Sequence, residues 1–99
     1  MNYRIELHPL AQQELEESYQ WYEECSTGLG NRFLSAIQTR FDRISAMPQL
    51  YAKKKGNYRE VLVQGFPFTI IFETLVKQKI VFVSYIFHTK RNPKLKYKR

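Results

Sequence analysis

The hydrophobic pattern of the chain changes its period near the middle, and this change limits the fold more than any other feature. Between Pro9 and Met47, apolar residues recur every three or four positions, as they do on the buried side of a helix. From Tyr58 to Phe87, β-branched and aromatic residues fill short runs between turn residues, as they do in strands. A chain of 99 residues is long enough for one core. We therefore expect a single α+β domain over residues 1–99.

Turn-forming residues divide the two halves into elements. Pro9 is placed to open a first helix over about 9–25, and Pro48 ends a second helix. Apolar and charged residues alternate over 3–7, which predicts a short strand before the helices. Three more strands are expected, with approximate ranges of 58–63, 69–75 and 80–87. The predicted order is βααβββ, an antiparallel-rich central sheet with a two-helix hairpin packed on one face.

The sequence also predicts how three segments pack. Tyr19, Trp21 and Tyr22 lie on or beside the apolar stripe of the first helix, so we expect them in the core rather than on a stacking platform. The lysine-rich segment 53–57 is expected to be a flexible loop. The tail over 93–99 is too charged to pack fully, and we expect it to be partly flexible.

Charge is distributed unevenly along the chain, whose net charge is +7. Residues 1–50 hold four Lys or Arg and seven Asp or Glu, a net of −3, whereas residues 51–99 hold twelve and two, a net of +10. Such asymmetry is typical of a protein with one surface for an anionic partner: a nucleic acid, a nucleoprotein assembly or an acidic protein segment. The simpler alternative is a basic tail that only aids solubility.

Several classes of protein are excluded by what the sequence lacks. It has no run of 18 apolar residues and no signal-like apolar segment after Met1, so we expect a cytoplasmic protein without a membrane partner. The single Cys25 can form no internal disulfide and has no metal-ligand spacing around it. Gly-rich phosphate loops, Ser/His/Asp sets, HExxH and paired carboxylates are absent. No metal or cofactor is expected, and any catalysis must use His, Lys, Arg and Tyr.

The residues that follow the last predicted strand form the densest functional cluster. His88 precedes Arg91 there, and an imidazole beside an arginine suits both phosphate binding and proton transfer. Arg59 reaches these two residues if its strand ends at the same edge of the sheet. The structural alternatives are a His88 hydrogen-bonded to backbone, a solvated Arg91, and an Arg59 paired with Glu60, Glu73 or a carboxylate of the first helix.

Ten cationic residues are candidates for binding a target. Lysine and arginine attract phosphates with little dependence on sequence, and arginine adds bidentate contacts. We expect the cations near positions 59, 88 and 91 to converge on one surface of the sheet. The ten candidates are Lys53, Lys54, Lys55, Arg59, Lys90, Arg91, Lys94, Lys96, Lys98 and Arg99.

The chain resembles the RelE/ParE superfamily of toxins, often called plasmid stabilisation proteins, over essentially its full length. The resemblance rests on the order of several weak features rather than on one motif. These features are an early strand before Pro9-Leu10-Ala11, a helix from Phe33-Leu34 to Met47-Pro48, Tyr58-Arg59 before an apolar strand, Gly65-Phe66-Pro67 before Ile70-Ile71-Phe72, and Ile80 to Phe87 before His88-x-x-Arg91-x-Pro93.

The resemblance implies a helix-backed sheet and a cognate antitoxin as partner, whose extended or helical segment wraps the toxin in a hetero-oligomer. An acidic, partly disordered segment also suits the net charge of +10 in residues 51–99. RelE-like members cut mRNA in the ribosomal A site, where basic residues and a tyrosine drive attack of a 2′-hydroxyl on the adjacent phosphate. ParE-like members bind and poison DNA gyrase and are not enzymes.

The scarcity of basic residues on the middle strands favours the ParE-like branch. RelE-like ribonucleases carry Lys and Arg on the second and third strands of this region, where this chain has only Arg59. Our first hypothesis is a non-enzymatic toxin that inhibits gyrase. One alternative is a metal-independent, ribosome-dependent mRNA endoribonuclease, and a second is a stand-alone nucleic-acid-binding module. For the ribonuclease, the resemblance implies a catalytic set of His88, Arg91, Arg59 and Tyr97.

Overall fold

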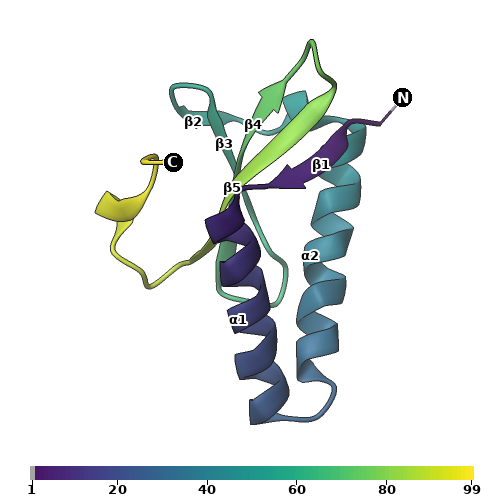
Figure 1. Ribbon diagram of the computed structural model, residues 1–99, viewed down its shortest axis with the longest axis vertical. Coiled ribbons are helices and arrows are strands. Elements are labelled where there is room, and N and C mark those ends of the chain that lie inside the picture. Colours follow the sequence, from purple (N-terminus) through teal and green to yellow (C-terminus); the bar gives the residue numbers. More distant parts are fainter. Residues whose placement is uncertain (1) are drawn as a thin grey trace.

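The computed structural model, which describes residues 2–99, contains one five-stranded sheet and a hairpin of two long helices (Figure 1). The helices are α1 (Pro9–Cys25) and α2 (Leu29–Ala46). The strands are β1 (Arg4–Leu7), β2 (Lys53–Lys55), β3 (Tyr58–Leu62), β4 (Phe68–Leu75) and β5 (Ile80–His88). Two short 3-10 helices are η1 (Pro48–Leu50) and η2 (Pro93–Leu95). The predicted α+β class and the βααβββ order of the main elements are confirmed.

The helices begin and pack as their sequences indicate. The Nδ1 atom of His8 accepts a hydrogen bond from the backbone N–H of Leu10 at 3.0 Å, and Pro9 takes the first helical position, where no N–H donor is needed. The buried side of α2 repeats every three or four positions, and its large apolar residues are Phe33, Ile37, Phe41 and Ile44.

Two glycines close the turn between the helices. Gly28 has a φ of 89°, a left-handed conformation that favours glycine. Gly30 lies so close to α1 that an added Cβ would be 2.8 Å from the ring of Tyr19. The carboxylate of Glu23 accepts hydrogen bonds at 3.0 Å from both glycine N–H groups. These contacts hold the two helices antiparallel, with both apolar stripes toward the sheet.

The sheet has the order β1-β5-β4-β3-β2, in which β1 is parallel to β5 and the other pairs are antiparallel. The parallel pairing ends where Leu7 lies opposite Val83, because the chain then turns into α1. β5 continues to His88, so its last residues have no strand on this side. This free edge of β5 runs beside α1, and it positions the site described below.

The lysine segment is a strand rather than the loop predicted from its composition. Lys53–Lys55 form β2, which pairs with β3 at the outer edge of the sheet. Gly56 has a φ of 55° and allows the tight turn between the two strands. Short, lysine-rich edge strands are common in sheets because their charges discourage pairing with another molecule.

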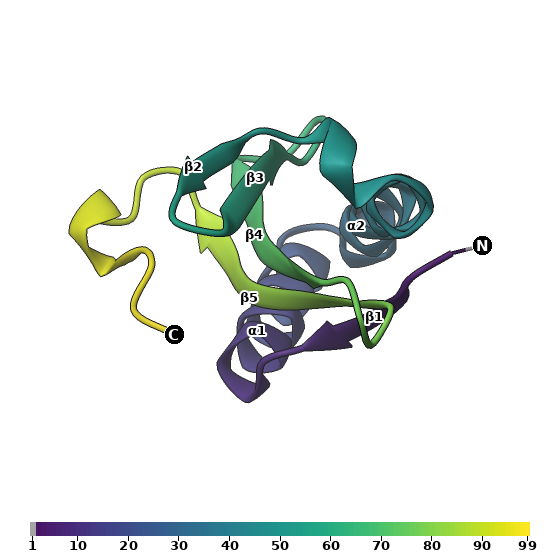
Figure 2. The same cartoon turned by 90° about the horizontal axis from the view of Figure 1, so that it is seen from above.

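The two faces of the sheet are covered by different parts of the chain. The face toward the helices supplies Ile70, Phe72 and Val81 to the main core. The opposite face carries a smaller cluster of Ile71, Tyr85 and Phe87, against which Tyr58 and Tyr97 pack. Figure 2 shows from above that the helices and the C-terminal tail lie on opposite sides of the sheet.

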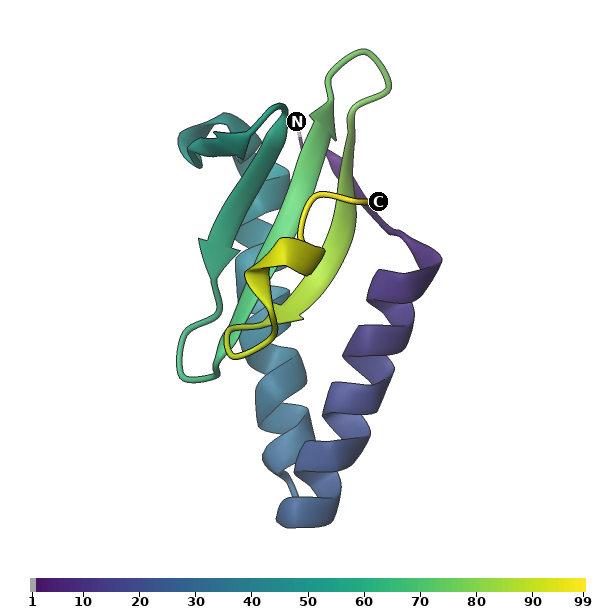
Figure 3. The same ribbon diagram turned by 90° about the vertical axis from the view of Figure 1, so that its left-hand side faces the viewer.

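The C-terminal tail packs on that second face, contrary to the expectation that it is too charged to do so. It crosses in front of β4 and β5, with α2 behind the sheet (Figure 3). The backbone N–H of Lys98 donates to the hydroxyl of Tyr85 at 2.8 Å, and the hydroxyl of Tyr58 donates to the carbonyl of Arg99. Tyrosines allow this packing because each offers apolar surface together with a hydrogen-bonding group.

Candidate functional site

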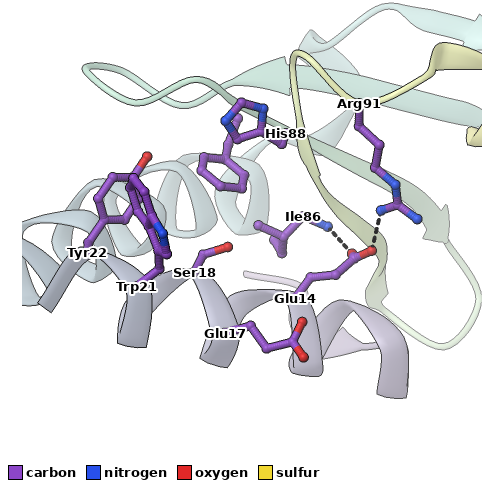
Figure 4. Close-up of a pocket in the computed structure, with 9 residues that line it drawn as sticks. Glu14, Glu17, Ser18, Trp21, Tyr22, Ile86, His88 and Arg91 are labelled. Carbon is purple, nitrogen blue, oxygen red and sulfur yellow. Dashed lines mark hydrogen bonds and ion pairs between the residues drawn. The ribbon is translucent and has the colours of Figure 1, made fainter. Parts of the chain in front are cut away.

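A groove of about 300 Å³ lies between α1 and the end of β5 (Figure 4). We call it the α1–β5 groove. His88 and Arg91, both predicted from the sequence as functional, line it together. Apolar, acidic and basic side chains share its wall, and the complete lining is Glu14, Glu17, Ser18, Trp21, Tyr22, Phe68, Ile86, His88 and Arg91.

A β-bulge in β5 directs His88 into the groove. Val83 and Tyr85 lie opposite neighbouring residues of β4, so Ser84 between them has no partner. Side chains of a strand alternate between its two faces, and the extra residue shifts this alternation by one. Val83 faces the helices before the bulge, and Ile86 and His88 face them after it. Without the bulge, His88 would face the tail.

The carboxylate of Glu14 joins α1, β5 and the tail. It accepts a hydrogen bond at 3.0 Å from the backbone N–H of Ile86, which lies on the edge that β1 leaves free. The Nη1 atom of Arg91 lies 2.6 Å from one oxygen, and Arg99 donates to both oxygens at 2.9 and 2.8 Å. One carboxylate therefore meets two guanidinium groups and a backbone donor.

These contacts also set the ionisation of Glu14. Burial by itself raises the pKa of this carboxyl group, but hydrogen bonds from Arg99, Arg91 and the Ile86 backbone outweigh the effect and leave the pKa below its ordinary value. Glu14 is therefore ionised at neutral pH, and it neutralises part of the charge that Arg91 brings to the groove.

His88 is held at the groove by one ring nitrogen. Its Nδ1 atom accepts a hydrogen bond from the backbone N–H of Lys90 at 3.1 Å, and its ring meets that of Phe68 edge-on, with centroids 5.0 Å apart. The backbone N–H of Arg91 donates to the carbonyl of His88 at 3.0 Å, which closes a tight turn. The structural alternative, a His88 hydrogen-bonded to backbone, is therefore correct for the Nδ1 atom. Within residues 2–99, Nε2 has no hydrogen-bond partner.

Trp21 lies at the rim of the groove rather than in the core. Its side chain is 62% exposed, and its ring contacts Tyr22 edge-on with centroids 5.3 Å apart. Tyr19 and Tyr22 pack against the core as predicted, whereas the prediction for Trp21 was wrong. Adjacent residues are about 100° apart around a helix, so Trp21 and Tyr22 cannot face the same way.

Arg59 lies at the opposite end of the sheet from His88. It pairs with Phe72 of β4, which lies opposite Val83 of β5, five positions before His88. Arg59 and His88 are therefore roughly 16 Å apart along the strand direction. They are also two strands apart across the sheet, at about 4.8 Å per strand. The Nη1 atom of Arg59 donates to the carbonyl of Tyr51 at 2.5 Å instead. The predicted convergence was wrong because β3 and β5 run in the same direction, and Arg59 lies near the start of its strand whereas His88 ends one.

Tyr97 lies on the far face of the sheet from the helices, where its hydroxyl donates to the carboxylate of Glu60. The Nζ atom of Lys96 lies 3.3 Å from the same carboxylate, and that of Lys55 lies 5.9 Å from the centre of the Tyr97 ring. Burial, together with the hydrogen bond to Glu60 and its charge, raises the pKa of Tyr97 to about 12. The hydroxyl therefore keeps its proton at neutral pH.

The other predicted target-binding cations lie on β2, around the end of β5 and along the tail. Lys53–Lys55 are exposed on β2, at the outer edge of the sheet. A second group is exposed around the end of β5 and along the tail, and its members are Lys90, Lys94 and Lys98. Carboxylates engage the remaining tail cations, Lys96 and Arg99. The structure therefore separates Arg59 and its partner Lys53 from His88, whereas Lys55 adjoins the tail through the ring of Tyr97.

Glu14, Glu17, Ser18 and Trp21 are groove residues that sequence reasoning missed. Three of them follow a helical period, since Glu14, Ser18 and Trp21 are spaced by four and three positions. This stripe runs beside the apolar stripe of α1. Its spacing is the signal that indicates a second face of the helix with its own contacts.

Solved structures that share this fold include two from toxin-antitoxin systems. A free-state arginine mutant of the E. coli toxin RelE has a TM-score of 0.69 and 11% identity, over 91% of this chain and 86% of that one. The chromosomal ParDE toxin-antitoxin system from P. aeruginosa has a TM-score of 0.74 and 15% identity, over 89% of this chain and 97% of that one. At these identities the likeness is one of fold, and the fold is that of the RelE and ParE toxins.

The family follows from the sequence. The family model for the ParE toxin of type II toxin-antitoxin systems, parDE, matches residues 5–93. This chain therefore belongs to the ParE toxin family, which confirms the RelE/ParE resemblance. No curated protein sequence matches it significantly.

Residues 2–99 show neither a membrane-spanning helix nor a cluster of metal ligands. None of the helices there has both the length and the hydropathy that a bilayer span requires. Over the same residues, no three His, Cys, Asp or Glu side chains are grouped so as to hold a metal ion.

Proposed function

We propose that this ParE-family toxin arrests growth by binding DNA gyrase, and that it acts as a binding protein rather than as an enzyme. The observation that carries the proposal is the separation of the groups that a ribonuclease needs at one phosphate. His88 lies in the α1–β5 groove, Tyr97 on the opposite face of the sheet, and Arg59 at its opposite end. Proton transfer requires acid and base within hydrogen-bond reach of the same reacting group.

The contacts of the remaining candidates also favour binding over catalysis. Glu14 neutralises Arg91, and Glu60 accepts the hydrogen bond of the Tyr97 hydroxyl. A pentavalent phosphate is stabilised by positive groups that point at it without a competing anion. Here Glu14 and Glu60 are such competing anions. Their ion pairs with Arg91 and Lys96 therefore stabilise the folded surface instead of a bound phosphate.

The exposed cations Lys90, Lys94 and Lys98 are the proposed contact with gyrase. They surround the end of β5 and the tail, and within residues 2–99 none of them forms an ion pair. Exposed charges of one sign speed association with an oppositely charged partner and orient it. The folded tail keeps Lys94 and Lys98 in fixed positions for such a contact.

The cognate antitoxin is proposed to dock in the α1–β5 groove. An acidic segment that orders on binding gains apolar contact with Trp21 and Phe68 there. It can also pair with the charge of Lys90, which is exposed two residues after His88. The toxin and its antitoxin would then form a hetero-oligomer. Because the proposed gyrase contact lies next to the groove, a bound antitoxin would also hinder the approach of gyrase.

The test of the gyrase proposal is plasmid cleavage by purified gyrase. Gyrase is mixed with supercoiled plasmid, ATP and the purified toxin, and the DNA is analysed after denaturant and protease treatment. We expect linear plasmid to accumulate with wild-type toxin. The triple variant Lys90→Gln, Lys94→Gln and Lys98→Gln should produce much less, whereas the variant Arg32→Gln and Arg40→Gln, which alters only α2, should act like wild type.

The ribonuclease alternative is tested in parallel with ribosomes, an mRNA and the same protein. Cuts in the mRNA at toxin concentrations that leave plasmid intact in the gyrase assay would reject the proposal. A toxin that arrests growth while producing neither linear plasmid nor mRNA cuts would reject both functions.

A further inference from the structure

A second hollow, of about 100 Å³, lies at the other end of the sheet from the α1–β5 groove. It is enclosed by η1, β2, the start of β3 and the end of β4. We call it the apical pocket, and its lining residues are Gln49, Lys53, Asn57, Arg59, Thr74 and Val76. The pocket has a third of the volume of the groove, so it suits a small chemical group rather than a side chain of a docked helix.

The apical pocket is positively charged. Lys53 of β2 pairs directly with Arg59 of β3, and side chains paired in this way lie on the same face of a sheet. No carboxylate lines the pocket. The ion pairs within residues 2–99 belong to Arg4, Arg91, Lys96 and Arg99, so the charges of Lys53 and Arg59 have no internal counter-ion.

The guanidinium group of Arg59 is oriented before any ligand arrives. Its Nη1 atom donates to the carbonyl of Tyr51 at 2.5 Å, and the ring of Tyr51 lies against that of Phe72 with centroids 6.0 Å apart. Among the described residues, Arg59 makes no other side-chain hydrogen bond. A fixed guanidinium with unused donors is the group that best matches the oxygens of a phosphate.

Neutral hydrogen-bond donors complete the lining. The Oγ1 atom of Thr74 is buried and has no hydrogen-bond partner within residues 2–99. Buried hydroxyls normally have a partner. Because Thr74 lines the pocket, rotation of its side chain would turn this hydroxyl toward an acceptor oxygen of a ligand and supply the partner that it lacks. The side-chain amide of Asn57 adds N–H donors to the same wall. That of Gln49 has one N–H left, because its Nε2 already donates to the hydroxyl of Tyr3 at 3.1 Å.

The surroundings of the pocket favour a polymer of phosphates over an isolated one. Lys54 is exposed beside the pocket on β2, and Lys77 and Lys79 are exposed in the turn that follows β4. Cations spaced around a single anion site can contact neighbouring phosphates of the same strand. We propose that the apical pocket binds one backbone phosphate of a nucleic acid, with Arg59 and Lys53 as its main ligands. This inference concerns the protein alone and does not require the gyrase proposal.

The proposal is tested by the affinity of the free toxin for a short labelled DNA duplex, measured by fluorescence anisotropy at several salt concentrations. The variant Lys53→Gln and Arg59→Gln should bind about tenfold or more weakly, and the slope of log affinity against log salt should decrease by about 1 or more. The control variant Arg32→Gln with Arg40→Gln also removes two positive charges, but from α2. It should change the affinity and the salt slope much less. Equal losses in the two double variants would overturn the proposal, because net charge alone would then explain the binding.

Two further measurements test whether weaker binding results from misfolding and which ligand the pocket binds. Lys53→Gln alone removes an exposed side chain, and it should still weaken DNA binding with an unchanged unfolding midpoint. In NMR spectra, DNA should shift the backbone amides of Asn57 and Thr74 more than those around His88. If inorganic phosphate shifts Asn57 and Thr74 but DNA does not, the pocket is a site for free phosphate and the nucleic-acid assignment is wrong. A gyrase assay that fails while these shifts occur would count only against the gyrase proposal.

Discussion

The carboxylate of Glu14 on α1 accepts hydrogen bonds at 2.9 and 2.8 Å from the two terminal nitrogens of Arg99, which lies 85 positions later in the chain. Arg99 also donates to the carbonyl of Ser84 at 2.8 Å, and its guanidinium lies 4.0 Å from the centre of the Tyr85 ring. The end of the chain is thereby attached to the bulge in β5 and to the first helix. This attachment keeps the tail on the second face of the sheet.

The variant Glu14→Gln should destabilise the protein by about 2 kcal/mol, because it leaves two partly buried guanidinium groups without their anion. The side chains of Glu14 and Arg99 are only 16% and 11% exposed. Urea unfolding measures the loss, and hydrogen exchange should show faster exchange at Lys98. Glu17→Gln alters an exposed carboxylate of the same groove and should have little effect. Equal unfolding midpoints for Glu14→Gln and wild type would contradict this role of Glu14.

Acid should weaken the wild-type protein more than the Glu14→Gln variant. The pKa of Glu14 is lower in the folded protein than its ordinary value of 4.5. Its contribution to stability is therefore complete above 4.5 and is lost as the pH falls through the folded pKa. Free energies of unfolding measured from neutral pH downward should converge for the two proteins. A constant difference at every pH would show that the ionisation of Glu14 is not responsible.

Alkaline pH should release the contact between Tyr97 and Glu60. The pKa of Tyr97 is raised from 10.0 to about 12, so the neutral hydroxyl stabilises the fold fully below pH 10 and loses this effect as the pH rises through about 12. The decline in unfolding free energy over this range should be smaller in Tyr97→Phe. Tyr51→Phe is the control, because no hydrogen bond of its hydroxyl is seen within residues 2–99. Parallel declines in all three proteins would exclude Tyr97 as the cause.

Replacement of Trp21 by alanine should weaken antitoxin binding by about tenfold or more, since exposed aromatic residues beside a groove commonly dominate interface energies. Its side chain is 62% exposed, so the fold should lose little stability. Isothermal titration with the cognate antitoxin provides the measurement. Leu50→Ala, which alters a 70% exposed residue at the other end of the protein, is the matched control. Similar affinities for the Trp21 variant and wild type would remove the α1–β5 groove as the docking site.

Much of the fold could be predicted because the patterns that encode it are local. The helical period around Phe33 and Ile37 and the run from Ile80 to Phe87 correctly identified α2 and β5. The faces of β5 could not be assigned, because a run with apolar residues on both faces does not reveal a bulge at Ser84. That single extra residue decides which side of the sheet His88 occupies.

The site was only partly predictable because its geometry depends on contacts that are distant in sequence. His88 and Arg91 were identified from their position after a strand, and they do lie together. Arg59 was grouped with them wrongly, since the direction of its strand relative to β5 follows from the sheet order. The spacing of Glu14 indicates a second face of α1 but not its partners, because Arg91 and Arg99 lie 77 and 85 positions later in the chain.

The central claim is that this toxin acts by binding and not by proton transfer. The double variant His88→Ala and Tyr97→Phe removes the imidazole and the phenol that a ribonuclease of this family would use. The most direct measurement is growth arrest and gyrase-dependent plasmid cleavage by this variant, after circular dichroism and urea unfolding have shown that it is folded. We predict that both remain close to wild-type levels. A folded double variant that no longer arrests growth, while wild-type toxin cuts mRNA on ribosomes, would contradict the account.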